Sequence, residues 1–107
     1  MTINELCKAA HDAAVENGFY DIDTTIEHRI ALIHSELSEA VEEVRRGNIG
    51  IFWKTDEHPW GFSVELADAM IRIADLAAEQ GINLESCIKA KMAYNQTREY
   101  RHGKVGI

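Results

Sequence analysis

The sequence has few cysteines. Cys7 and Cys87 are the only two in 107 residues, and both lie among apolar residues with helical spacing. Two cysteines without a recognisable spacing do not make the disulfide framework that small secreted domains use. A free cysteine packs as a small hydrophobic side chain. We therefore expect two buried thiols and no structural disulfide.

Basic residues are also scarce. Lys and Arg together number 11 against 18 Asp and Glu, which gives a net charge of −7. General binding to nucleic acid needs a basic surface that displaces counterions, so we expect no nucleic-acid partner. The basic residues gather at one end, since residues 89–107 carry five basic and one acidic side chain, whereas residues 1–88 carry 6 and 17. A phosphate ligand would have to be met by this segment or through a metal ion.

Long apolar runs are absent from the sequence. No stretch is long enough to span a bilayer, and the first residues do not contain the continuous apolar segment of a secretory signal. We therefore expect a cytoplasmic protein without a membrane partner. The length of 107 residues suits a single domain with a small core, here residues 1–107.

Helical periodicity defines four segments of the chain. Thr2-x-x-Glu5 and Thr24-x-x-Glu27 each have the spacing of a capping box, in which a hydroxyl and a carboxylate satisfy free N–H groups at a helix start. Glycines follow the first three segments and can end them in the left-handed conformation. We predict helices over residues 3–17, 25–46, 63–80 and 83–100, with stops at Gly18, Gly47 and Gly81.

Residues 48–62 interrupt this pattern. The segment NIGIFWKTDEHPWGF contains the only proline, two glycines and both tryptophans, without helical or alternating periodicity. It is predicted to be a loop, and an aromatic-rich loop of this length in a small domain is usually functional. We expect Trp53 or Trp60 to stack on a nucleobase, although core packing explains them equally well, and Lys54 to reach a phosphate.

The segment 63–80 is apolar around nearly its whole circumference. Such a helix needs cover on most sides, which a single layer of four helices supplies only in part. We therefore predict an all-α, four-helix bundle that oligomerises through apolar helix faces as a homodimer or homotetramer.

Two acidic pairs stand out on the second and third predicted helices. Glu36 and Glu39 are three residues apart, as are Glu65 and Asp68, so each pair projects from one helix face. Packed as antiparallel neighbours, the helices would bring four carboxylates together, an oxygen cage that suits Mg²⁺. The alternative is a solvated acidic face in which Asp68 pairs with Arg72 one turn on. A di-iron centre would need Glu-x-x-His on two helices, and Glu99-x-x-His102 is the only such spacing here.

These residues resemble a known family. Glu36-x-x-Glu39, 25 intervening residues and then Glu65-x-x-Asp68 are similar to the metal motif of the MazG-like all-α nucleoside triphosphate pyrophosphohydrolases. The flanking stretches ALIHSELSEAVEEV, VELADAMIRIADLAAEQGINLE and KAKMAYNQTR also resemble the family, so that the likeness covers residues 25–104, about three quarters of the chain. The family usually has a further Glu immediately before the first pair, where this chain has Ser35. That departure bears on the number of bound metal ions.

The resemblance implies a nucleotide-pool-cleaning hydrolase. A nucleoside triphosphate, with a deoxy sugar preferred, would be converted with water to the monophosphate and pyrophosphate. Mg²⁺, or Mn²⁺ in its place, would be held by Glu36, Glu39, Glu65 and Asp68, with Glu39 also polarising the attacking water. Lys91, Asn95 and Arg98 share one helix face and correspond to the family's substrate-binding side, although a solvated basic stripe has the same spacing. The alternative function is a catalytically idle, antitoxin-like helical interaction module of the same fold.

Overall fold

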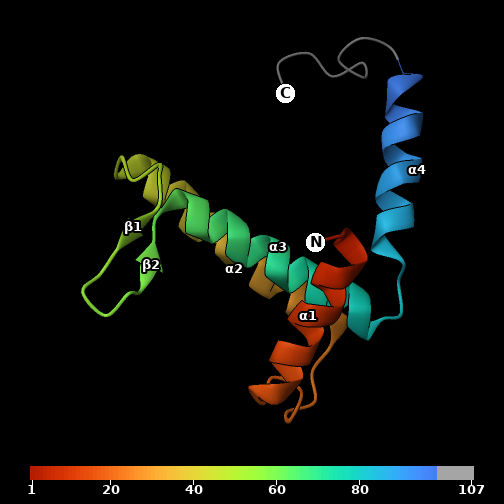
Figure 1. Cartoon of the computed structure of the whole chain (residues 1–107), viewed down its shortest axis with the longest axis horizontal. Helices are drawn as coiled ribbons and strands as arrows, with labels where there is room; N and C mark the ends of the chain where they lie inside the picture. Colours follow the sequence, from red (N-terminus) through yellow and green to blue (C-terminus); the bar gives the residue numbers. More distant parts are fainter. Residues whose placement is uncertain (99–107) are drawn as a thin grey trace.

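The described part of the chain, residues 1–98 of the computed structural model, is almost entirely helical (Figure 1). It confirms the all-α class. The helices are α1 (Ile3–Glu16), α2 (Ile26–Arg45), α3 (Phe62–Glu79) and α4 (Leu84–Gln96). Each begins and ends within a few residues of the predicted bounds; the last predicted residues, 99 and 100, lie outside the described part. Two short strands, β1 (Phe52–Trp53) and β2 (Pro59–Trp60), lie between α2 and α3.

The start of α1 has the predicted capping box. Thr2 Oγ1 accepts a hydrogen bond from the Glu5 backbone N–H at 3.1 Å, and the Glu5 carboxylate accepts one from the Thr2 N–H at 2.8 Å. The predicted box at Thr24 is wrong by one residue. Thr25 is the N-cap of α2, and its hydroxyl accepts from the His28 N–H, so Glu27 does not occupy the position that completes a capping box. The predicted stops Gly18, Gly47 and Gly81 all have positive φ.

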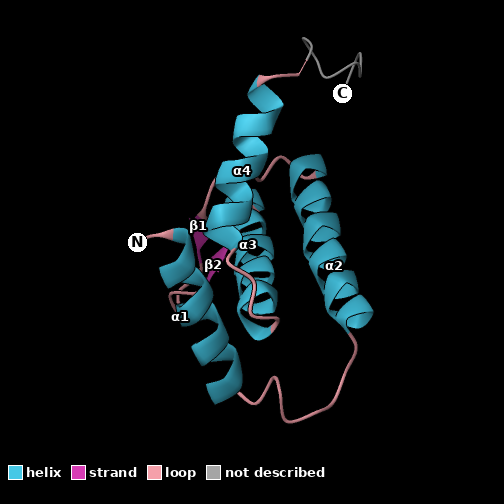
Figure 2. Ribbon diagram, turned by 90° about the vertical axis from the view of Figure 1, so that its right-hand side faces the viewer, coloured by secondary structure: helices cyan, strands magenta, loops and turns pink. Residues whose placement is uncertain are grey.

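Helix α3 lies between α1 and α2 (Figures 1 and 2). Two ion pairs join α2 to α3: Glu36 pairs with Arg72, and Arg29, seven residues earlier on α2, pairs with Glu79, seven residues later on α3. The two helices are therefore antiparallel, as the acidic-pair argument required. On the other side, α1 packs against α3 through a small core of Cys7, Ala10, Ala74 and Ala77. Small side chains let these two backbones approach closely.

The predicted loop between α2 and α3 contains a hairpin. Phe52 faces Trp60 across β1 and β2, and their rings lie 4.8 Å apart between centroids. Such a cross-strand aromatic contact stabilises a strand pair even when the strands are too short to show alternation in the sequence. Gly61 ends the hairpin with φ 119, and a Cβ there would lie 2.5 Å from the Gly50 carbonyl oxygen. Only glycine fits this turn into α3.

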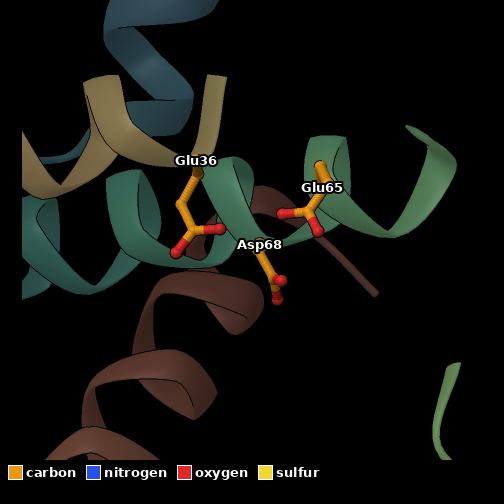
Figure 3. A group of neighbouring side chains, drawn as sticks. All are labelled: Glu36, Glu65 and Asp68. Atoms are coloured by element: carbon orange, nitrogen blue, oxygen red, sulfur yellow. The ribbon is translucent and has the colours of Figure 1, made fainter. Parts of the chain in front are cut away.

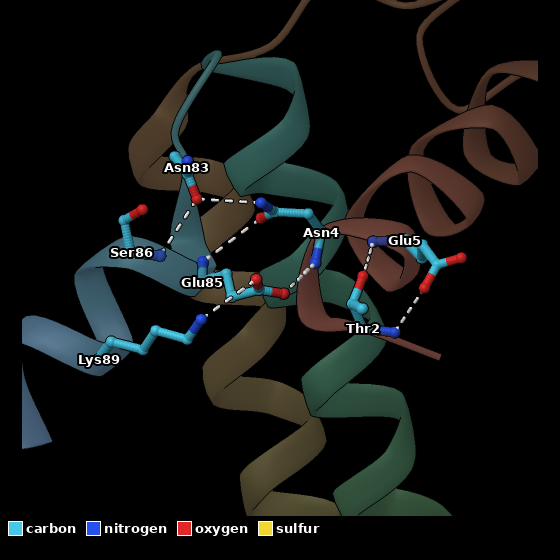
Figure 4. A network of polar contacts seen from close by, with 7 residues as sticks. All are labelled: Thr2, Asn4, Glu5, Asn83, Glu85, Ser86 and Lys89. Carbon is cyan, nitrogen blue, oxygen red and sulfur yellow. Dashed lines mark hydrogen bonds and ion pairs between the residues drawn. The ribbon is translucent and has the colours of Figure 1, made fainter.

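Helix α4 projects away from the other helices (Figure 1). Its first turn is held to the start of α1, where the Asn4 side chain donates to Asn83 Oδ1 at 3.0 Å and accepts from the Glu85 N–H at 3.4 Å (Figure 4). The Glu85 carboxylate in turn accepts from the Asn4 N–H at 3.4 Å. No residue of α4 is buried. Within the single chain, α1, α2 and α3 form the packed unit and α4 is an arm.

The single chain leaves many large apolar side chains exposed. Those on α2 and α3 are spaced three, four or seven residues apart, and they include Ile30, Leu37, Val41, Leu66, Met70 and Ile73. On each helix this spacing forms a stripe. Both stripes are exposed in the single chain. We call these six residues the apolar face.

The two cysteines differ in their surroundings. Cys7 is 5 % exposed and belongs to the core between α1 and α3, which confirms the expectation of a buried thiol. Cys87 is exposed, so that expectation is wrong for it. The physical reason is the direction of α4, which packs against the core through Leu84 in its first turn and then projects away from the other helices. Among residues 1–98, no helix is both long and apolar enough to cross a bilayer.

Candidate metal centre

Three carboxylates from two helices meet at one point of the structure. Glu36 comes from α2, and Glu65 and Asp68 come from α3 (Figure 3). Each offers one oxygen, and these oxygens lie within 4.8 Å of one another. The carboxylates of Glu36 and Glu65 point toward each other (Figure 3). The structure therefore brings together three of the four predicted ligands.

Arg72 supplies a positive charge beside this cluster. Its Nε donates a hydrogen bond to Glu36 Oε1 at 2.9 Å, and Glu36 is 8 % exposed. The sequence alternative paired Arg72 with Asp68 on the same helix. Arg72 instead spans from α3 to α2, where it compensates the burial of a charge that would otherwise be costly. Its guanidinium thereby fixes the position of one carboxylate of the cluster.

Glu65 is the most perturbed carboxyl group of the cluster. Burial in the α2–α3 interface, then hydrogen bonding to Glu39 and Glu36, then the negative charge of both, raise its pKa to about 7. Its Oε2 is buried and makes no hydrogen bond within the described residues. A buried carboxylate oxygen without a hydrogen-bond donor is available to coordinate a cation.

Asp68 and Glu39 complete the surroundings of Glu65. Burial raises the pKa of Asp68, the charge of Glu36 adds to the rise, and Arg72 opposes it. Glu39 approaches Glu65 closely enough to affect its protonation, yet its own side chain is exposed, and it is not one of the three residues whose oxygens converge. Glu39 thus lies at the solvent side of the cluster.

A pocket of about 360 Å³ adjoins the cluster. Glu36 and Asp68 belong to the cluster and also line the pocket. The rest of the lining comes from α1, from the residues that follow α1, and from α3. Volumes of this size are typical of sites for small molecules. The acidic cluster therefore opens onto a space that can hold the organic part of a ligand.

A second polar network, which the sequence analysis missed, lies at the far side of this pocket. Asp75 is 7 % exposed and accepts a hydrogen bond from the Tyr20 hydroxyl at 2.7 Å, while His11 Nδ1 lies 2.9 Å from the same oxygen. Arg29 stacks over the Tyr20 ring at 4.4 Å and pairs with Glu79 at 2.8 Å. The signal was present: Asp75 is a further acidic residue on the same face of an otherwise apolar helix, seven residues after Asp68.

The predicted base-stacking and loop residues lie outside the pocket. Trp53 is 63 % exposed on β1, and Trp60 packs on Phe52 in the hairpin. Lys54 is exposed and its backbone N–H closes the hairpin turn by donating to the His58 carbonyl. Trp60 therefore packs within the hairpin, and stacking of Trp53 or Trp60 on a nucleobase stays a prediction.

The predicted substrate residues lie together near the end of α4, with Lys91 and Asn95 on the helix and Arg98 two residues beyond its last residue. Lys91 Nζ and the Arg98 guanidinium lie 4.8 and 5.8 Å from the ring centroid of Tyr94, on which both cations pack. Asn95 lies one helical turn after Lys91, and its Oδ1 is buried without a hydrogen bond in the described residues. None of the three lines the pocket or belongs to the carboxylate cluster. They lie on the projecting arm.

The fold and site together define an all-α protein with an interhelical carboxylate cluster beside a pocket. Comparisons of the chain with protein-family models, with curated proteins and with solved structures find no match. The geometry of the cluster and the pocket therefore provides the structural basis for inferring a function.

Proposed function

We propose that this protein is a Mg²⁺-dependent nucleoside triphosphate pyrophosphohydrolase that converts a nucleoside triphosphate and water to the monophosphate and pyrophosphate. The observation that carries the proposal is the convergence of Glu36, Glu65 and Asp68, with oxygens within 4.8 Å of one another, at the mouth of a pocket. The likeness of both acidic pairs to the MazG-like motif names the reaction class.

The donor set suits a hard divalent cation. All three converging groups are carboxylates, and oxygen ligands of this type favour Mg²⁺ or Mn²⁺ over softer metals. The unbonded, buried Oε2 of Glu65 gives a cation a position that no hydrogen-bond donor within residues 1–98 occupies. Glu36, Glu65 and Asp68 would hold the ion.

The chemistry needs both a metal and a base. A Mg²⁺ ion held by Glu36, Glu65 and Asp68 would supply positive charge against the triphosphate and act as a Lewis acid. Glu39, exposed beside Glu65, is the carboxylate best situated to accept a proton from the attacking water. Arg72 holds Glu36 in place through its 2.9 Å hydrogen bond. The pocket then receives the nucleoside, and we expect a deoxy sugar to be preferred.

The predicted phosphate-binding residues of one chain would contact the substrate held at the carboxylate cluster of a second chain. Lys91 and Asn95 lie on α4, and Arg98 lies two residues beyond its end. This helix contacts chiefly α1 and projects away from α2 and α3. A second copy packed on the apolar face would complete a four-helix arrangement and could bring its own α4 to the first chain's carboxylates. A homodimer or homotetramer therefore supports both the packing and the chemistry.

Oligomerisation has a direct test. Light scattering at micromolar concentration should give the mass of a dimer or tetramer, and Leu37→Glu on the apolar face should shift it toward the monomer. Leu37 is 46 % exposed in the single chain, so the substitution has little to disturb within it. A monomeric wild type at this concentration would refute the shared site.

The reaction is tested by a panel of nucleoside triphosphates and their deoxy forms with Mg²⁺, assayed for pyrophosphate. Pyrophosphate as the first product is expected, and orthophosphate as the first product would exclude attack at the α-phosphorus. Equal rates for matched ribo and deoxy forms would contradict the sugar preference. Metal binding without turnover of any nucleotide would favour the helical interaction module instead.

A further inference from the structure

The pocket beside the carboxylates has an apolar wall and a polar far side. Ala10, Ala13 and Ala14 share one face of α1, and their methyl groups form a shallow apolar surface. Phe19 adds an aromatic ring at the end of that surface. A flat heterocycle suits such a wall, because it buries its faces there and presents its edge to whatever polar groups remain.

Asp75 is the fixed polar group at the far side of this pocket. It follows Asp68 by seven residues on α3, so both carboxylates lie on one helix face. Within residues 1–98, the Tyr20 hydroxyl at 2.7 Å and His11 Nδ1 at 2.9 Å both bind Oδ1 of Asp75. Two contacts to one oxygen hold the carboxylate in place and leave its acceptor Oδ2 for a ligand.

The other polar groups of the pocket discriminate less between a hydrogen-bond donor and an acceptor on the ligand. Arg72 donates through Nε to Glu36, so its guanidinium lies beside the carboxylate cluster. The Asn17 side chain can both donate and accept, so it tolerates either kind of ligand edge. An ionised carboxylate, in contrast, only accepts. Asp75 is therefore the group that can tell a donor on the ligand from an acceptor.

We propose that Asp75 selects nucleotides whose base carries an exocyclic amino group, as cytosine and adenine do. This inference depends on the proposed function, since the metal-bound phosphates at Glu36 and Asp68 would direct the base into the pocket. An amino group donates to Asp75. A ring carbonyl in its place would set oxygen lone pairs against the carboxylate and leave a buried acceptor without a donor, which is how polar sites reject isosteres.

Matched substrate pairs test this directly. dCTP and dUTP differ by an amino group in place of a carbonyl at one ring carbon, and the adjacent ring nitrogen is an acceptor in dCTP and an N–H donor in dUTP. dATP and dITP differ in the same way. We expect kcat/KM to favour the amino member of each pair by about tenfold to a hundredfold, the range of one hydrogen bond to a charged group. Equal kcat/KM within both pairs would overturn the inference.

Two variants separate Asp75 from its surroundings. Asp75→Asn can donate as well as accept, so the preference should fall to about twofold or reverse. Tyr20→Phe removes one hydrogen bond to Oδ1 but keeps the carboxylate, and its preference should stay within about threefold of wild type. An unchanged preference in a folded Asp75→Asn protein, judged by circular dichroism, would refute the role of Asp75.

The outcomes also distinguish this inference from the proposed function. If Asp75→Asn does not fold, the wild-type preference in the two pairs decides the matter. Pyrophosphate release without base preference would refute the selection by Asp75 and leave the hydrolase assignment intact. No pyrophosphate from these four nucleotides or from any other member of the nucleotide panel would refute both.

Discussion

Replacing Glu65 by Gln should stabilise the metal-free protein, and only at neutral or alkaline pH. The folded chain raises the pKa of Glu65 from 4.5 to about 7, through burial and then through Glu39 and Glu36. Below pH 4.5 the carboxyl is protonated in folded and unfolded chains alike, so it affects stability little. Between pH 4.5 and about 7 the unfolded chain ionises first, and the folded state loses stability until the full penalty is reached above pH 7.

The expected size of this effect follows from the pKa difference. One pKa unit equals about 1.4 kcal/mol, so the rise from 4.5 to about 7 corresponds to about 3 kcal/mol at pH 8. Water reaches the half-buried side chain and reduces this to about 1–2 kcal/mol. A Gln side chain has nearly the same shape as Glu and does not ionise. For a domain of this size, Glu65→Gln should raise the melting temperature by about 5–10 °C at pH 8 and much less at pH 5.

The assay is thermal unfolding in EDTA at pH 5 and pH 8, at one protein concentration because an oligomer makes the melting temperature concentration-dependent. Glu16→Gln, on the exposed end of α1, is the matched control and should change stability by about 0.5 kcal/mol or less at both values. Added Mg²⁺ should stabilise wild type and leave Glu65→Gln nearly unchanged. Equal gains for Glu65→Gln at both pH values would refute the coupling of Glu65 to its neighbours.

Three further predictions test other parts of the structure. Glu39→Gln should lose most of its turnover yet melt at a higher temperature than wild type in EDTA, because it removes one of the carboxylate charges that repel each other. Added Mg²⁺ should reverse the order of the two melting temperatures. Identical melting with activity retained would remove Glu39 from the site. Lys91→Ala and Arg98→Ala should each weaken substrate affinity by about 1–3 kcal/mol with Mg²⁺ binding unaltered, and unaltered kinetics would make that residue part of a solvated stripe. Gly61→Ala should lower the free energy of unfolding, measured by circular dichroism, by about 1–3 kcal/mol. The reason is that φ is 119 at this residue and the Gly50 carbonyl oxygen would lie 2.5 Å from the new Cβ. An unchanged melting curve would show that the turn rearranges without strain.

Local features of the fold were predictable because they depend on residues near one another in sequence. The Thr2 capping box and the glycine stops involve neighbours within one turn, and the structure has them where the pattern placed them. The hairpin of β1 and β2 was not predicted, because it depends on a contact between residues further apart than one helical turn. Its stability depends on Phe52 and Trp60, which pair across the turn in strands too short to alternate.

Partner choice for charged side chains was only partly predictable. Spacing indicated that Glu36, Glu65 and Asp68 could converge, and they do. Spacing also allowed Arg72 to pair along its own helix, whereas it pairs across to Glu36. An i,i+4 pair on a helix surface contributes a few tenths of a kcal/mol, and compensating a buried carboxylate contributes more. Burial decided the partner, and burial is a property of packing.

Helical periodicity and contacts within a turn were enough to predict the helices, their stops and the acidic pairs on α2 and α3. Three other features depend on how the helices pack: Glu39 lies at the solvent side of the cluster, Asp75 shares a pocket with Asp68, and α4 carries Lys91 away from the carboxylates. These outcomes depend on the order in which helices pack and on the direction in which each leaves its neighbour. That direction is set by a few contacts between residues about 80 positions apart, such as Asn4 with Asn83, which no local pattern encodes.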